Sequence, residues 1–409
     1  MTSENLALIE LYSVKQGRYL SPSEMSDSRT NATSVPVIGG NGILGYTDKA
    51  SNQRDVVLVT CRGSRCGLLQ WVNAPVWVSN NAIACDTGSD LGNQLLRYLL
   101  GTSDFSDVTT GSAQPQITIG HLSRKRFDVP PKAWWPGIVS TLATIDRQIQ
   151  ALHETSATLE TIAQALFKSW FVDFDPVRAK QQGLAPAGMD EAMAGLFPDS
   201  FDESALGLVP KGWRPGVLGN VVRAIKSQIH PSELRAEMKY VGLEHLPRKS
   251  LSLVDWDTAD GLESAKAKFS EGDVLFGKLR PYFHKVVVAP FDGVCSTDIL
   301  VCQSKQRAYY GFAAMQLFSA ELIAYADRLS NGAKMPRIGW SDIAAYPLIV
   351  PTELTASTYT EVVSPLLDRM KGNLFQAQTL STLRDTLLPR LISGRLRLPE
   401  ALVEMEKAA

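Results

Sequence analysis

The sequence predicts an α/β (α+β) protein in which two globular domains are separated by two long antiparallel helices that form a coiled-coil-like spacer. Three observations lead to this prediction: the length of the chain, an internal pseudo-repeat, and a heptad pattern that recurs at equivalent places. The 409 residues exceed what one hydrophobic core usually organises. Apolar residues make up 44% and charged residues 20%, an ordinary globular mixture that argues against disorder.

The pseudo-repeat consists of short segments that are alike and lie in different halves of the chain. The matching pairs are Asp55–Leu58 with Asp273–Phe276, Gln114–Ile117 with Met335–Ile338, and Phe127–Pro130 with Leu348–Pro351. The last two pairs share one constant offset, the spacing from Gln114 to Met335. A repeat of this length indicates a duplicated domain.

Each half continues, after its Val-Pro, with apolar residues at alternating steps of three and four. The expected helix-pairing residues are Ile138, Leu142, Ile145, Ile149, Leu152, Leu159, Leu166, Val363, Leu366, Met370, Asn373, Leu380, Leu387 and Leu391. Two amphipathic helices packed separately on their own domains are the alternative, but the shared register favours antiparallel pairing. Asn373 is expected to fix the register, and Pro365 and Pro389 predict a late start or kinks in the second helix. A helix over about 136–171 would span roughly 50 Å.

These patterns divide the chain into six segments. Residues 1–130 and 213–352 are the expected globular domains, and 131–172 and 353–396 the spacer helices. Residues 173–212 read as an irregular connector and 397–409 as a tail. Within the domains, short helices are expected at 91–100 and 310–327, and β-rich runs at 35–44, 56–60, 71–72, 76–78, 217–222, 239–241, 274–276, 286–288 and 299–302.

The sequence offers little support for catalysis or metal binding. Residues 272–278 match the GxxxxGK spacing of a phosphate loop, but Leu279 replaces the hydroxyl that would hold Mg²⁺ and residues 274–276 read as a strand. The five cysteines and five histidines form no recognised metal spacing, so the thiols are expected to be free. The first residues lack a signal-peptide pattern and no apolar run could span a membrane, which predicts a cytoplasmic protein.

Seven segments carry a resemblance to a known family. They are Ala165–Pro176, Met189–Ala192, Phe197–Ser200, Asp273–Tyr282, Met335–Ile338, Pro347–Pro351 and Leu387–Leu396. Together they resemble the specificity (S) subunits of type I restriction-modification systems over nearly the whole chain. The formal net charge of −1 would be unusual for an autonomous DNA-binding protein, but partner subunits can supply phosphate contacts.

The resemblance implies a noncatalytic subunit. Each target-recognition domain would read one half of a bipartite, asymmetric double-stranded DNA site. The helices would set the spacing and dock two methyltransferase (modification) subunits, which would bring S-adenosylmethionine and methylate adenine. Restriction subunits would add ATP- and Mg²⁺-dependent cleavage, and the S subunit itself would bind no cofactor. A coiled-coil protein-binding scaffold and, less favoured, a nucleotide-hydrolysing or DNA-modifying enzyme remain as alternatives.

Candidate DNA-binding residues are basic side chains in loops beside the strands at Asp55 and Asp273, because Arg and Lys contact guanine edges and phosphates. They are Arg62, Arg65, Lys278, Arg280, Lys285, Lys334 and Arg337. For each of them an ordinary surface role is an equal alternative. The aromatic end of the first helix, namely Phe167, Trp170, Phe171 and Phe174, is a candidate partner-docking patch, with core packing as the alternative.

Overall fold

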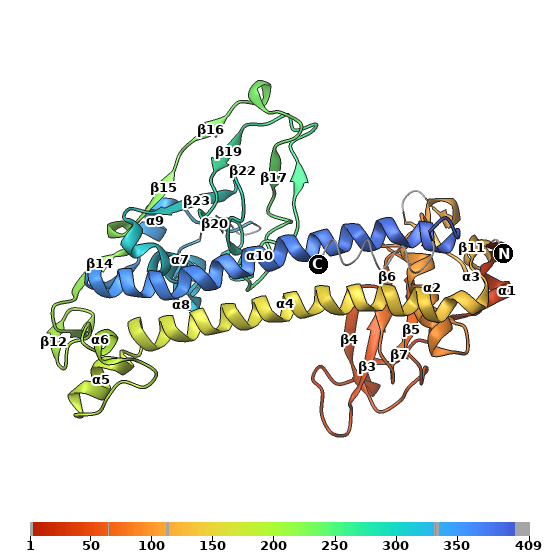
Figure 1. The fold of residues 1–409 in the computed structure, drawn as a ribbon, viewed down its shortest axis with the longest axis horizontal. Coiled ribbons are helices and arrows are strands. Elements are labelled where there is room, and N and C mark those ends of the chain that lie inside the picture. The colour runs from red at the N-terminus through yellow and green to blue at the C-terminus, as the bar shows by residue number, and fades with distance from the viewer. Residues whose placement is uncertain (1–2, 64, 112–113, 331, 333–334, 397–409) are drawn as a thin grey trace. The chain divides into compact units, whose positions relative to one another are not determined.

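The computed structural model describes residues 3–63, 65–111, 114–330, 332 and 335–396, and the chain forms two compact units. Unit 1 comprises residues 1–149 and 378–409, and unit 2 comprises residues 150–377. Two long helices, α4 (Trp135–Phe171) and α10 (Glu353–Ile392), contribute residues to both units (Figure 1). The predicted mixed fold with two long helices is confirmed. Within the described residues, no helix has the length and apolar character needed to cross a membrane.

Unit 1 is built on a four-stranded antiparallel sheet of order β2-β8-β5-β6, beside a three-stranded sheet of order β4-β3-β7. Two strand pairs, β1-β11 and β10-β9, complete the strands of the unit. The bounds are β1 Glu4–Ala7, α1 Leu8–Leu11, β2 Ser13–Gln16, β3 Val35–Gly39, β4 Gly42–Thr47, β5 Val56–Thr60, β6 Leu69–Val72, β7 Trp77–Val78, β8 Ala82–Asp86, α2 Asp90–Gly101, β9 Thr109–Thr110, β10 Gln116–Ile117, α3 Ile119–Arg124 and β11 Arg126–Val129. Every residue of β5 is buried, as expected for the centre of a sheet.

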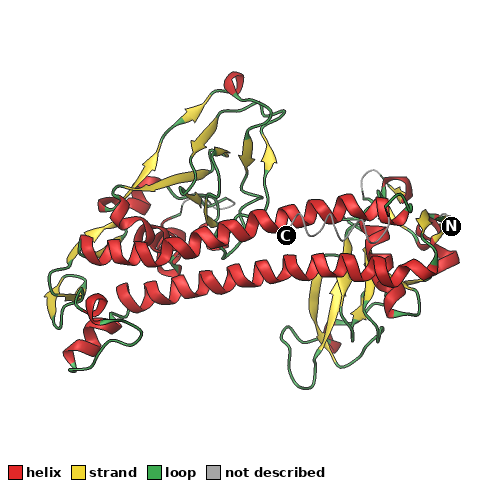
Figure 2. Ribbon diagram, in the orientation of Figure 1, coloured by secondary structure: helices red, strands yellow, loops and turns green. Residues whose placement is uncertain are grey.

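Unit 2 contains a four-stranded antiparallel sheet of order β15-β23-β20-β21 and a five-stranded sheet of order β16-β19-β22-β17-β18. Figure 2 shows these strands in yellow beside the red helices of the unit. The bounds are α5 Asp175–Gln181, α6 Glu191–Ala194, β12 Phe201–Ser204, β13 Gly207–Pro210, β14 Arg214–Val217, β15 Val222–Ile225, β16 Gln228–Ile229, β17 Lys239–Val241, β18 Asp257–Thr258, β19 Lys266–Phe269, β20 Val274–Gly277, β21 Val286–Val288, β22 Gly293–Cys295, β23 Ile299–Ser304, α7 Tyr310–Phe318, α8 Ala320–Leu329, α9 Trp340–Ala344 and β24 Pro347–Val350.

The duplication is visible in the sheets. The order β2-β8-β5-β6 in unit 1 matches β15-β23-β20-β21 in unit 2, and the pair β1-β11 matches β14-β24. Strand register fixes the alignment, because Val57 lies opposite Cys85 while Val274 lies opposite Cys302. Val57 is therefore equivalent to Val274, and the alignment of Asp55 with Asp273 is wrong by one position. The two cysteines of this alignment are buried, and all five thiols of the chain are free.

Four local expectations are corrected. The helix expected at 310–327 is two helices, since the Ser319 side chain accepts from the Leu322 amide and caps a new helix, α8. The run 217–222 is not one strand, because a 3₁₀ turn separates β14 from β15. Helix α10 does not start late: it begins at Glu353 and continues through both prolines. The connector also contains regular structure, the helices α5 and α6 and the hairpin β12-β13.

Helices α4 and α10 contact each other within each unit. In unit 1 the Asp146 carboxylate accepts from Arg384 at 2.9 Å. In unit 2 the Tyr359 hydroxyl donates to the Ala163 carbonyl at 2.8 Å. Contact between later residues of one helix and earlier residues of the other is the antiparallel arrangement that the heptads predict. All fourteen expected pairing residues are buried or half-buried.

Asn373 occupies the polar position in this seam. Its side-chain amide donates to the Ser156 hydroxyl at 3.2 Å and to the Leu152 carbonyl at 3.5 Å. Leu152 is the residue that the offset from Gln114 to Met335 makes equivalent to Asn373 itself. A polar side chain in the apolar seam that meets its own sequence equivalent on the other helix accords with a role in fixing register.

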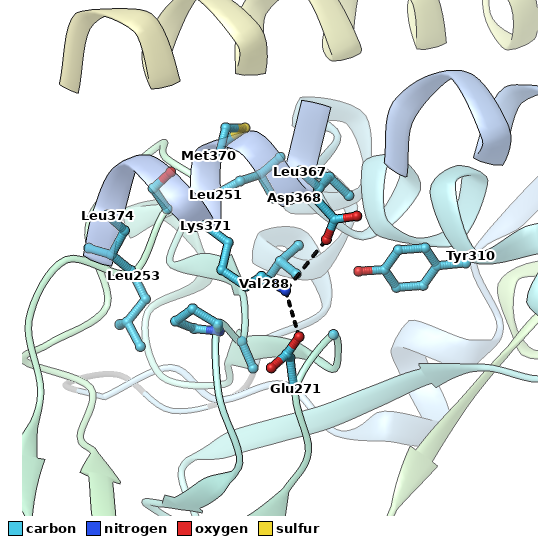
Figure 3. A pocket seen from close by; sticks show the side chains of 14 residues that line it. Leu251, Leu253, Glu271, Val288, Tyr310, Leu367, Asp368, Met370, Lys371 and Leu374 are labelled. Atoms are coloured by element: carbon cyan, nitrogen blue, oxygen red, sulfur yellow. Dashed lines mark hydrogen bonds and ion pairs between the residues drawn. The ribbon is translucent and has the colours of Figure 1, made fainter. Parts of the chain in front are cut away.

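The globular part of unit 2 is attached to both helices. A cavity of about 70 Å³ lies beside α10. Among its lining residues (Figure 3), the Lys371 ammonium lies 2.6 Å from Glu271 and 3.5 Å from Asp368. From α4, the Glu160 carboxylate accepts the Leu251 amide at 2.9 Å and contacts the Ser250 hydroxyl. Burial raises the pKa of Glu160 above its usual value. These contacts hold the orientation of the domain on the helices of its own unit.

Candidate nucleic-acid interface

In unit 1 the loop after β5 forms a small cluster with the segment that leads into α3. The Gly63 amide donates to the Pro115 carbonyl at 3.2 Å, and the Ile117 amide donates to the Cys61 carbonyl at 3.0 Å. Arg62 and Arg65 are exposed and line a hollow of about 720 Å³. The other lining residues are Gly40, Asn41, Leu44, Thr60, Gly63, Asn81, Gln114 and Pro115. Exposed guanidinium and amide groups around a hollow can donate to phosphates and base edges.

In unit 2 the loop after β20 makes the same backbone contacts. The Arg280 amide donates to the Pro336 carbonyl at 2.8 Å, and the Ile338 amide donates to the Lys278 carbonyl at 3.2 Å. Arg280 adopts a left-handed backbone conformation, with φ 49°. The Arg337 guanidinium, 54% exposed, lies 2.7 Å from the Asp298 carboxylate. The structure therefore brings Lys278, Arg280 and Arg337 together around one loop.

The remaining two candidates differ from these. The Lys285 ammonium donates to the Leu243 carbonyl, and burial lowers its pKa. A lysine whose ammonium donates to a backbone carbonyl of the same chain is less available to a ligand than an exposed lysine. Lys334 lies outside the described residues.

The structure gives residues 272–278 no phosphate-loop geometry. Strand β20 pairs with β21 on one side and β23 on the other, so the backbone groups from Val274 to Gly277 belong to the sheet. A phosphate loop instead needs free amides that curl around the anion. The nucleotide-hydrolase alternative therefore loses its structural basis.

The four aromatic residues at the end of α4 are buried, and core packing accounts for them. Phe171 packs edge-on against Phe312 and Tyr359, with ring centroids 5.0 and 4.9 Å apart. Trp170 contacts Phe197, with centroids 5.1 Å apart. Their assignment as a docking patch is corrected for this reason: Phe167, Trp170, Phe171 and Phe174 are all covered by other residues of unit 2. Exposed apolar side chains near this helix end are Ile162 and Val172 instead.

Sequence reasoning missed several polar residues beside the predicted ones. Asn81 and Asp298 precede β8 and β23, and their carbonyls accept the amides of Cys61 and Lys278. Gln116 occupies the position of Arg337, as the match of Gln114–Ile117 with Met335–Ile338 already indicated. Three exposed basic residues of unit 1, Lys15, Arg18 and Arg54, also line a separate hollow of about 660 Å³. Only the fold brings these residues together, because they lie far apart in the chain.

Comparison with known proteins finds similar sequences among specificity subunits. A family model described as the type I restriction modification DNA specificity domain matches residues 2–161. The type I restriction enzyme MjaIX specificity subunit of Methanocaldococcus jannaschii is 24% identical over 319 residues, which cover 75% of this chain and 70% of that protein. The HindI specificity subunit of Haemophilus influenzae is 48% identical over 71 residues, 17% of this chain and 16% of that protein.

A solved structure supports the fold. The type I restriction-modification S subunit from M. genitalium matches with a TM-score of 0.57 and 13% sequence identity, over 96% of this chain and 99% of that chain. The duplicated sheets, the paired long helices, the matched domain model and the named relatives lead to one conclusion. The chain is similar in sequence to type I restriction-modification specificity subunits, and it shares its fold with a solved S subunit.

Proposed function

We propose that this chain is the noncatalytic DNA sequence-recognition subunit of a type I restriction-modification complex, and that each domain reads one half of a bipartite, asymmetric double-stranded site. The observation that carries the proposal is the repeated loop cluster: the same backbone hydrogen bonds recur beside β5 and β20, with different polar side chains on each. Two loops with the same backbone hydrogen bonds but different side chains are suited to the recognition of two different half-sites.

The side chains of the two clusters are suited to DNA. Arg62 and Arg65 in the first and Lys278, Arg280 and Arg337 in the second can donate to guanine edges and to phosphates. The formal net charge of −1 is no obstacle, because a partner subunit that clamps the same duplex adds its own phosphate contacts. Helices α4 and α10, of 37 and 40 residues, would set the distance between the two half-sites.

The partners in this proposal are two methyltransferase subunits and the restriction subunits. S-adenosylmethionine, ATP and Mg²⁺ would bind to those partners and not to this chain. A groove of about 330 Å³ between α4 and α8 offers one docking place for a methyltransferase subunit. Ala165, Lys168, Val172 and Glu321 line it, and Ile162 is exposed nearby on the same helix. Apolar side chains with a charged rim are typical of protein interfaces.

Modified-base sequencing tests the proposal. DNA from cells that express this chain with the methyltransferase of its own system is compared with DNA from cells that lack only this chain. We expect a gapped, asymmetric motif with methylated adenines that depends on the chain. An active methyltransferase without any new motif would refute the proposal. Partner binding that persists at high salt without DNA would instead favour a protein-binding scaffold, since DNA contacts weaken steeply with salt.

A further inference from the structure

Strand register and backbone hydrogen bonds define equivalent positions in the two loop clusters. The Cys61 amide donates to the Asn81 carbonyl, and the Lys278 amide donates to the Asp298 carbonyl, with the same spacing between donor and acceptor along the chain. On the other side of the loop, Ile117 donates to Cys61 as Ile338 donates to Lys278. Asn81 is thus equivalent to Asp298, and Gln116 is equivalent to Arg337.

All four of these residues are followed directly in the chain by a buried residue. Ile117 and Ile338, each 1% exposed, follow Gln116 and Arg337 directly. Ala82 and Ile299, which follow Asn81 and Asp298, are also buried. Asn81 and Arg337 are exposed, and Gln116 and Asp298 are half-buried, so each of the four side chains reaches solvent beside a buried residue. The equivalent solvent-accessible residues are therefore Asn81 and Gln116 in unit 1, and Asp298 and Arg337 in unit 2.

The chemistry of the two positions differs between the units. In unit 2 a carboxylate holds a guanidinium at 2.7 Å, a charge-assisted contact that restricts the rotation of an otherwise flexible side chain. In unit 1 both positions carry uncharged carboxamides. In the major groove, a guanidinium donates two hydrogen bonds to guanine O6 and N7, whereas a carboxamide both donates to and accepts from adenine N6 and N7.

We infer that these two pairs are base-reading positions of the two domains: Arg337, positioned by Asp298, reads a guanine in one half-site, and Gln116, at the equivalent position of unit 1, reads an adenine in the other. This inference rests on the proposed function. To that function it adds, for each domain, the residue that contacts a base and the kind of base that it recognises. Asp298 is a positioning residue, since it acts through the orientation of Arg337.

An exchange of the pairs tests the inference, again by modified-base sequencing with the methyltransferase of the same system. The variant R337Q/D298N carries the unit 1 pair in unit 2, and Q116R/N81D does the reverse. We expect the first to replace one guanine by adenine in one half-site only, and the second to replace one adenine by guanine in the other half-site only. Discrimination at that base pair should change by about 5- to 150-fold, the effect of one bidentate contact.

Single variants separate positioning from contact. D298N alone should leave the guanine preferred but admit other bases at that position, while R337K should relax it similarly, because lysine lacks the planar fork. A purely structural role of Asp298 would instead lower methylation equally at every sequence. The matched control is R223Q, which removes an exposed arginine of β15 outside the cluster and should leave the motif unchanged.

The outcomes distinguish this inference from the proposed function. If the natural chain directs a bipartite motif and both pair exchanges leave that motif unchanged, the inference is wrong and the proposed function stands. A motif whose two half-sites lack the expected guanine and adenine would also overturn the inference. If the natural chain directs no motif, the proposed function fails, and this inference fails with it.

Discussion

Asp146 offers a quantitative test of how α4 and α10 are joined in unit 1. Its carboxylate lies 2.9 Å from Arg384 and 3.2 Å from Arg97, and accepts the Tyr98 hydroxyl at 2.8 Å. Burial raises the pKa of Tyr98, which keeps this hydroxyl a donor. Arg384 also contacts a second carboxylate, Asp385, at 2.9 Å. The Asp146 side chain is 15% exposed and that of Asp385 is 62% exposed, so the two carboxylates form a matched pair.

The variant D146A should destabilise unit 1 by about 2–3 kcal/mol. Loss of one partner from a buried ion pair costs roughly 3–5 kcal/mol, and the partial exposure of both arginines reduces that cost. The control D385A removes a screened contact and should cost no more than about 0.5 kcal/mol. Both positions lie inside helices, so the change in helix propensity is the same. The expected loss corresponds to a fall in Tm of roughly 4–12 °C.

Urea unfolding combined with amide hydrogen exchange provides the assay, since peptides from α2 report on unit 1 and peptides from α7 on unit 2. We expect lower protection in unit 1 only, and a coupling energy of about 1–3 kcal/mol between D146A and R384A in a double-mutant cycle. Equal costs for D146A and D385A would refute the claim that burial of this carboxylate joins the helices, and so would a coupling energy near zero.

Four further predictions concern unit 2. In the natural chain, stability should fall as pH rises from the ordinary glutamate pKa through the raised pKa of Glu160, because the folded state holds that proton more tightly. E160Q should abolish this loss. Urea midpoints across pH measure it, and parallel pH curves for the variant and the natural chain would contradict it. N373L should raise stability by about 1 kcal/mol, since within the described residues the buried Oδ1 has no hydrogen-bond partner; a lower urea midpoint would oppose this reasoning. K371M should cost under about 1 kcal/mol in the same assay, as the ammonium is partly exposed, so a larger loss would mean the contact is more buried than described. Exchange of residues 213–350 for the equivalent domain of a relative should alter one half-site in modified-base sequencing, and a change in both would exclude independent reading.

Much of the fold could be predicted because its signals are local. The heptads of α4 and α10 recur every few residues, so the seam from Ile138 to Leu166 follows from periodicity alone. The break at Ser319 was missed because apolar residues on both sides of it continue the helical pattern, and only the cap ends the helix.

The site was predictable only in part, because its frame is made by distant segments. Arg62, Lys278 and Arg337 were found as basic residues in loops near a strand. Asn81 and Asp298 were not, since their partners in the fold lie far along the chain and carry no shared motif. The sequence offset between equivalent residues is also shorter in the strands, as from Val57 to Val274, than in the later segments, as from Gln114 to Met335. This change of offset hid the equivalence of Asn81 and Asp298. Sheet register would have been the signal, and it exists only after folding.

The division into units has a consequence for biosynthesis. Unit 1 includes α10 residues from Gln378 onward, although its other residues end at Ile149. The ribosome must therefore make all of residues 150–377 before the first unit can be completed. At about 5–20 residues per second this takes roughly 10–50 s. During that interval Asp146 lacks its Arg384 partner, so the nascent first domain is the stage at which we expect chaperones to bind.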